Sequence, residues 1–265
     1  MNSPANFHRL ESRLRLRGLL VTATALHIGA AKGDDQGNSD MPVLRDGRGH
    51  PFIPGASLKG VLRATIEGLI NGTGDRSGKL SACDPLAKGC GQHDEGRRSA
   101  VDLHEHCTVC RMLGSHVLAS HVRIGDALLR HDHDDGARVI EMRDGVAIDR
   151  DLGRVYKSNK YDFEVVAPGV GFDLEVFVEN PEPWLMGLLM LGWDQLAAGY
   201  TALGGFSSRG LGRVELHWEE GQQWRAADLL AGREPSRWQG AALLQEQDRW
   251  RQALVQYLEG DDVRE

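Results

Sequence analysis

The eleven residues 204–214 restrict most strongly what this chain can fold into. They hold four glycines and two arginines and lead directly into an alternating, strand-like stretch. Glycine lets backbone N–H groups approach a phosphate closely, and the arginine guanidinium presents a fork of donors that fits phosphate oxygens. We therefore predict an anion-binding loop before a strand. Its predicted contact residues are Gly204, Gly205, Ser207, Ser208, Arg209 and Gly210.

A second motif, residues 53–63, reads as a turn that delivers the chain into a helix expected from Ser57 to about Ile70. Ser57 is the predicted N-cap, since a serine oxygen satisfies free N–H groups at a helix start. Lys59 and Arg63 are four residues apart beside this N-terminus, where a phosphate binds readily. The alternative is an ordinary solvated helix face. The predicted apolar face comprises Val61, Leu62, Ile66 and Leu69.

Two further segments stand in a fixed order with these motifs: Leu26-His27-Ile28-Gly29 and Asp40-Met41-Pro42-Val43-Leu44-Arg45-Asp46. The four ordered segments together resemble the RAMP superfamily of CRISPR-associated proteins over roughly residues 13–216. Within it, the chain looks most like the CRISPR-associated protein seven family, the repeated backbone subunit of type III interference complexes. Four ordered motifs are more specific than one glycine loop.

The resemblance implies a subunit that binds CRISPR guide RNA and cleaves the paired target RNA. Its implied partners are other CRISPR effector subunits and neighbouring RAMP subunits. The position of the family's cleaving aspartate is taken by Asp40, while Asp34 and Asp35 share its loop and are alternatives. A carboxylate there can hold Mg²⁺ or another divalent cation, or help deprotonate a 2′-hydroxyl, which gives a 2′,3′-cyclic phosphate and a 5′-hydroxyl. For His27 we expect a buried structural imidazole.

The expected fold is α+β, one RAMP domain over 1–265 with a ferredoxin-like (RRM-like) core. The predicted strands are 13–28, 41–44, 117–129, 172–178 and 213–218, and the predicted helices are 57–70, 185–203 and 239–258. A β-hairpin "thumb" is expected within 131–168, with alternating residues from 139 to 163. Residues 71–115 are expected to be an insertion, and 219–265 a C-terminal extension without a matching motif.

All four cysteines lie in one segment: Cys83, six residues, Cys90, sixteen residues, Cys107, two residues, Cys110. We expect a cytoplasmic chain, in which such clustering favours a metal over disulfides. The closely spaced last pair forms a knuckle, and the first pair can close a tetrahedral zinc shell. Three histidines, His93, His104 and His106, are near enough to replace a cysteine, and four uncoordinated thiols are the other alternative. A closed shell predicts a structural ion.

Charge and hydropathy limit the function classes. The net charge of −7 and pI of about 5.9 argue against indiscriminate nucleic-acid binding. No stretch approaches a membrane span, so no membrane partner is expected. Three hypotheses stay open: an endoribonuclease subunit, a non-catalytic RNA-binding scaffold of the same complex, and a zinc-bearing nucleic-acid module outside CRISPR biology. Only Asp40 separates the first two.

Overall fold

The computed structural model describes residues 9–30, 39–73, 78–84, 89–90, 106–130 and 139–260, with the backbone alone at 156–159. Within them one antiparallel sheet has the strand order β2-β4-β7-β1-β8-β9, and β3 also pairs with β7. Its strands are β1 (Ser12–Thr22), β2 (Phe52–Ile53), β3 (Val122–Ile124), β4 (Ala127–Leu129), β7 (Gly171–Glu179), β8 (Val214–Arg225) and β9 (Ser236–Gln239).

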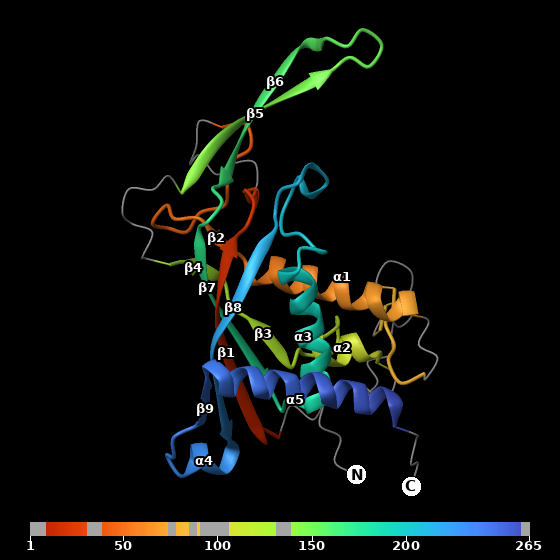
Figure 1. Cartoon of the computed structure of the whole chain (residues 1–265), viewed down its shortest axis with the longest axis vertical. Helices are drawn as coiled ribbons and strands as arrows, with labels where there is room; N and C mark the ends of the chain where they lie inside the picture. The colour runs from red at the N-terminus through yellow and green to blue at the C-terminus, as the bar shows by residue number, and fades with distance from the viewer. Residues whose placement is uncertain are drawn as a thin grey trace.

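Helices α1 (Gly55–Thr73), α2 (Thr108–Leu113), α3 (Pro183–Ala197) and α5 (Gly240–Glu259) lie together on one side of this sheet (Figure 1). The short α4 (Ala226–Leu230) lies apart from them, in the connection between β8 and β9. Strand β1 shows why: Leu14, Leu16 and Leu20 alternate inward to a core shared with α1 and α3. On its other face Arg13 pairs with Glu179 at 2.8 Å. The sheet therefore has one apolar, helix-covered face and one charged face.

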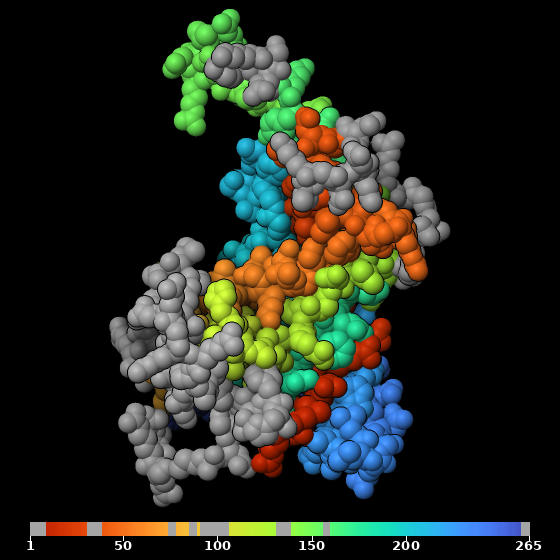
Figure 2. Space-filling view, turned by 180° about the vertical axis from the view of Figure 1, so that it is seen from behind, coloured from red at the N-terminus to blue at the C-terminus, as the bar shows by residue number. Residues whose placement is uncertain are grey.

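A two-stranded hairpin projects from the body at the top of Figure 1. It consists of β5 (Ile140–Ile148) and β6 (Val155–Val166), which pair antiparallel from Ile140↔Val166 outward. The space-filling view also shows this arm standing away from the rest of the molecule (Figure 2). The alternating pattern predicted from 139 to 163 is thus a hairpin in the structure.

The N-cap prediction for Ser57 is wrong. Helix α1 begins at Gly55, whose N–H donates to Asp126 Oδ1 at 2.8 Å. A Cβ at Gly55 would lie 2.2 Å from the Ile124 carbonyl oxygen, so this close approach requires glycine. The cap comes from a residue 71 positions away, and local sequence carries no sign of it. Of the predicted apolar face, Leu62 and Ile66 are buried, and Leu58 and Ile70 complete it, whereas Val61 and Leu69 are only half-buried.

Several predicted boundaries also differ. The first strand ends at 22, the strand expected over 117–129 is two short strands separated by 125–126, and α3 ends at 197 rather than 203. Strand β8 continues to 225, where it pairs with β9. Residues 107, 109, 110, 112 and 113 lie in the main hydrophobic core. The end of the expected insertion at 115 is therefore not a boundary of the core.

The C-terminal extension is packed into the body through α5, which lies against α3. A Cβ at Gly187 of α3 would lie 2.3 Å from the Trp250 carbonyl oxygen of α5, so the two backbones nearly touch. Arg251 binds Asp194 of α3 through two nitrogens, at 2.8 and 2.9 Å. Among the helices of the described residues, none combines the length and apolar content needed to cross a bilayer.

Candidate functional site

The structure fixes Asp40 to the base of the hairpin. The Asp40 N–H donates to Asp162 Oδ1 at 2.7 Å, and the Asp162 N–H donates to Asp40 Oδ2 at 3.2 Å. Asp162 belongs to β6, 122 residues further along the chain. Asp40 itself is exposed. The pair therefore holds a solvent-facing carboxylate in one place; Asp34 and Asp35 lie outside the described residues.

The residues after Asp40 are attached to the same strand. Met41 accepts a hydrogen bond from the Glu164 N–H at 3.0 Å and forms a parallel bridge with Phe163. The buried Glu164 carboxylate accepts from the Val43 N–H at 3.0 Å and from the Arg45 guanidinium at 2.9 Å. A buried carboxylate with two donors is well satisfied. Segment 40–45 therefore runs beside β6 and is hydrogen-bonded to it.

The glycine-rich loop meets the hairpin base from another side. Its Arg209 donates to the Tyr161 hydroxyl at 2.9 Å, and its Phe206 ring lies 4.8 Å from that of Phe163, centroid to centroid. Gly204, Gly205, Ser207, Ser208, Arg209 and Gly210 are all exposed. Three consecutive residues of β6, 161–163, therefore contact both the loop and the Asp40 segment.

Part of the loop's glycine content serves packing rather than anion access. Gly204 has φ +72°, and its Cβ would lie 2.2 Å from the His27 carbonyl oxygen. That carbonyl accepts from the Gly205 N–H at 2.8 Å, and the Gly210 N–H donates to the Ser207 carbonyl at 3.0 Å. Within the described residues, the N–H groups of Ser207 and Ser208 have no such backbone acceptor. These two N–H groups are the candidate backbone donors for an anion.

His27 is a structural residue, as expected. Its side chain is buried, and Nδ1 donates to the Glu164 carbonyl oxygen at 2.7 Å. The ring also packs at 5.1 Å from Phe206 and edge-on to Phe163 at 6.2 Å. His27 therefore joins the glycine-rich loop to β6.

The structure does not bring Lys59 and Arg63 together with the glycine-rich loop. Both face the cysteine segment and residues 113–120, where they line an open groove. Thr65 lies on the roughly opposite side of α1, since successive helix residues are about 100° apart. Its Oγ1 lies 3.1 Å from Thr201 Oγ1, a few residues before the glycine-rich loop. Ser57 is half-buried in the first turn. The two motifs predicted to contact an anion therefore lie in different parts of the structure.

Arg63 is engaged by protein groups on three sides. It donates to Cys110 Sγ at 2.9 Å, to the Gly114 carbonyl at 2.8 Å and to Glu67 at 2.8 Å. Lys59 Nζ donates to the Val122 carbonyl at 3.3 Å. Burial lowers the pKa of Lys59, and the neighbouring Arg63 charge adds to this effect. Arg63 is therefore part of the cysteine site, where each of its three nitrogens already donates one hydrogen bond to the protein.

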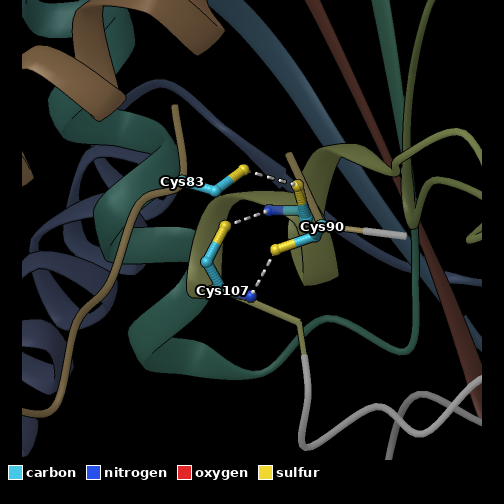
Figure 3. Close-up of side chains that lie close together, drawn as sticks. Cys83, Cys90 and Cys107 are labelled. Atoms are coloured by element: carbon cyan, nitrogen blue, oxygen red, sulfur yellow. Dashed lines mark hydrogen bonds between the residues drawn. The ribbon is translucent and has the colours of Figure 1, made fainter. Parts of the chain in front are cut away.

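The four cysteines converge. The sulfurs of Cys83, Cys90, Cys107 and Cys110 all lie within 4.8 Å of one another, and the labelled side chains of Figure 3 point toward a common centre. The Cys83 and Cys110 sulfurs are 3.6 Å apart, too far for a disulfide bond of about 2.05 Å. Tetrahedral zinc with bonds of about 2.3 Å would separate its sulfurs by about 3.8 Å. The donor set therefore fits one metal ion.

The surroundings of the sulfurs favour the thiolate form in some respects and oppose it in others. The Cys107 N–H donates to Cys90 Sγ at 3.2 Å, and the Cys110 N–H donates to Cys107 Sγ at 3.4 Å. Burial raises the pKa of the Cys110 thiol, and nearby Cys107 raises it further, whereas a bound cation would favour the thiolate form. His106 Nε2 lies 3.2 Å from Ser115 Oγ and is outside the four-cysteine group. His93 and His104 lie outside the described residues.

Sequence reasoning missed Asp162 and Tyr161. Both belong to the alternating pattern of a hairpin strand, which identifies the strand but not the partners of its residues. No local signal links Asp162 to Asp40, because their contact depends on how segment 40–45 is laid beside β6.

The chain resembles known proteins over most of its length. Over 219 residues the chain is 28% identical to a protein of Methanocaldococcus jannaschii described as "CRISPR system Cms endoribonuclease Csm3", covering 78% of this chain and 79% of that protein. A protein of Methanothermobacter thermautotrophicus with the same description is 23% identical over 219 residues, 78% of this chain and 85% of its own length. The model of the RAMP superfamily matches residues 19–215, from β1 into β8, and the chain belongs to that superfamily.

Proposed function

We propose that this protein is a backbone subunit of a type III CRISPR effector complex that binds guide RNA and cleaves the paired target RNA. The observation that carries the proposal is Asp40, an exposed carboxylate held in place at the base of a projecting hairpin in a RAMP superfamily chain. The relatives that resemble it over most of their length are described as endoribonucleases. Its partners are the guide RNA, the target RNA, neighbouring RAMP subunits and other subunits of the complex.

The RNA surface that we propose is smaller than the sequence motifs indicated. It consists of the exposed loop 204–210, with the guanidinium of Arg209 and the N–H groups of Ser207 and Ser208 as phosphate donors. Ser57 and Lys59 extend it only if the RNA also passes along α1. Contacts of this kind hold the backbone of a strand and leave sequence recognition to base pairing.

Cleavage is proposed to occur by attack of a target 2′-hydroxyl on the adjacent phosphate. The 2′-oxygen loses its proton and bonds to phosphorus, the bond from phosphorus to the 5′-oxygen breaks, and that oxygen gains a proton. The Asp40 carboxylate would accept a proton or hold a divalent cation at this position. Mg²⁺ is commonly held by one or two carboxylates and substrate phosphates, and it would stabilise the developing negative charge. The hairpin would keep the reacting nucleotide out of the duplex stack beside Asp40.

The four cysteines are proposed to hold a structural zinc ion. A shell of four thiolates leaves no open position for a substrate, so this ion would contribute folding free energy rather than chemistry. The site ties Cys83 and Cys90 to α2, which is part of the main core. It is separate from the proposed cleavage site.

The test uses the assembled complex with guide RNA and a labelled target in Mg²⁺. Asp40→Ala should keep target binding and slow cleavage by about 10²- to 10⁴-fold, the usual contribution of one acid-base group. A target with a single 2′-deoxy nucleotide at the cut site should resist the wild-type complex equally. If Asp40→Ala cuts at the wild-type rate, Asp40 has no catalytic role. If the wild-type complex binds target but never cuts it, the protein is the non-catalytic scaffold.

A further inference from the structure

We propose that Asp162 is the positioning residue of the cleavage site, acting through its hydrogen bond to the Asp40 backbone. This inference rests on the proposed function of Asp40. Asp162 accepts the Asp40 N–H at 2.7 Å, and its own N–H binds Asp40 Oδ2 at 3.2 Å. Together the two bonds fix both the backbone and one carboxylate oxygen of Asp40.

The geometry leaves the second oxygen of Asp40 for the substrate. Within the described residues, no hydrogen bond to Asp40 Oδ1 accompanies the bond to Oδ2. One oxygen is thus anchored to a strand while the other faces solvent on an exposed residue. A reacting group held this way loses little freedom when substrate binds, and a displacement of about 1 Å can cost about 10²-fold in rate.

The charge of Asp162 does not explain its presence. Asp144 lies directly opposite Asp162 in the β5-β6 register, so the two carboxylates share one face of the hairpin. Like charges in that position are destabilising. With Asp40 also adjacent, a third negative charge would repel both RNA and the other two groups. The benefit that offsets this cost is the hydrogen-bond acceptor that Asp162 provides for the Asp40 N–H. An uncharged acceptor at this position would make the same hydrogen bond.

The Asp40–Asp162 pair also connects the proposed cleavage site to the hairpin. Asp162 lies in the same strand whose outer part forms the projecting arm (Figure 1). Met41, Val43 and Arg45 are bound to Phe163 and Glu164 of that strand, so the whole segment follows β6. Asp40 therefore moves with the hairpin, and an RNA that displaces the hairpin base displaces the carboxylate as well.

Three variants test this in the assembled complex: Asp162→Asn, Asp162→Ala and Asp144→Ala. Asparagine at position 162 keeps the Oδ1 acceptor and loses the charge, whereas alanine loses both. Asp144→Ala removes the carboxylate that faces Asp162. The Asp144 side chain makes no hydrogen bond to Asp40 in the described structure. Asp162→Val, a good strand former, replaces alanine if that variant does not assemble. The readouts are single-turnover cleavage, target binding, and hydrogen exchange of a peptide covering residues 39–44.

We expect Asp162→Ala to cut about 10- to 100-fold more slowly at unchanged target affinity, with faster exchange at residues 39–44. The Asp162→Asn and Asp144→Ala variants should cleave at a rate within about threefold of the wild type, because both keep a hydrogen-bond acceptor for the Asp40 N–H. Equal loss in Asp162→Asn and Asp162→Ala would overturn the inference in favour of a charge or metal-ligand role. Full activity of Asp162→Ala would overturn it as well. Full activity of Asp40→Ala would instead remove the proposed function, whatever position 162 does.

Discussion

Replacing Arg63 by alanine separates two interpretations of one residue. Sequence motifs indicate a phosphate contact at a helix N-terminus, whereas the structure places the guanidinium against Cys110 Sγ, the Gly114 carbonyl and Glu67. Its side chain is only 25% exposed. We expect Arg63→Ala to weaken the metal site and to leave guide-RNA binding almost unchanged.

The magnitude follows from the hydrogen bonds that the substitution removes. A hydrogen bond from a charged donor contributes about 1.5–3 kcal/mol, and here the sulfur and the Gly114 carbonyl each lose one such donor. Removing an outer partner of a metal ligand typically lowers metal affinity about 10- to 100-fold. That range corresponds to about 1.4–2.8 kcal/mol, at about 1.4 kcal/mol per tenfold. The two bonds sum to about 3–6 kcal/mol, more than this range, because part of the hydrogen-bond energy also stabilises the apo protein and does not count toward metal affinity.

The assay pairs zinc competition against a chromophoric chelator with guide-RNA binding over a salt series. Arg63→Lys keeps the positive charge without the donor fork, so it should lose most of the zinc affinity that Arg63→Ala loses. Arg209→Ala is the matched control on the exposed loop, and it should lower the salt slope by about 0.7 without affecting zinc. A salt slope that falls by this amount in Arg63→Ala, with unchanged zinc affinity, would refute the structural reasoning.

Two further predictions concern folding. Replacing Cys107 and Cys110 together by serine, or adding a strong chelator, should abolish the bound zinc and lower the melting temperature more than it affects the cleavage chemistry. Metal analysis and calorimetry measure the two effects. A metal-free but equally stable wild-type protein would contradict this prediction. Gly187→Ala should destabilise the protein by about 1–3 kcal/mol in denaturant unfolding, because the added Cβ would meet the Trp250 carbonyl oxygen at 2.3 Å, whereas Gly68→Ala, with open space around it, should not.

The sequence predicted those parts of the fold that depend on local periodicity. The alternation of β7 and the amphipathic pattern of α5 each reflect one element meeting one apolar surface, and the hairpin strands pair with each other, so pattern and structure agree. The start of α1 was predicted wrongly because its cap, Asp126, comes from the turn between β3 and β4. The extension of β8 was missed because its last residues pair with β9, a strand of four residues with no clear pattern.

The candidate site divides in the same way. The cysteine group was predictable since its spacing alone carries the chemistry, and the four sulfurs do converge. The role of Arg63 was not, because a charge four residues from Lys59 near a helix start looks the same whether it faces RNA or a sulfur. Only the packing of α1 against α2 decides between them.

The hairpin base explains how two motifs that lie about 160 residues apart can serve one reaction. Tyr161 covers Gly145, where a Cβ would lie 2.1 Å from the ring, and Arg209 binds the Tyr161 hydroxyl. On the next residue of β6, Asp162 holds Asp40. The loop proposed to hold RNA and the carboxylate proposed to cut it are thus attached to adjacent residues of one strand. Because successive side chains of a strand point to opposite faces, the glycine-rich loop and Asp40 contact β6 from its two faces, and this one strand can hold them at a fixed separation.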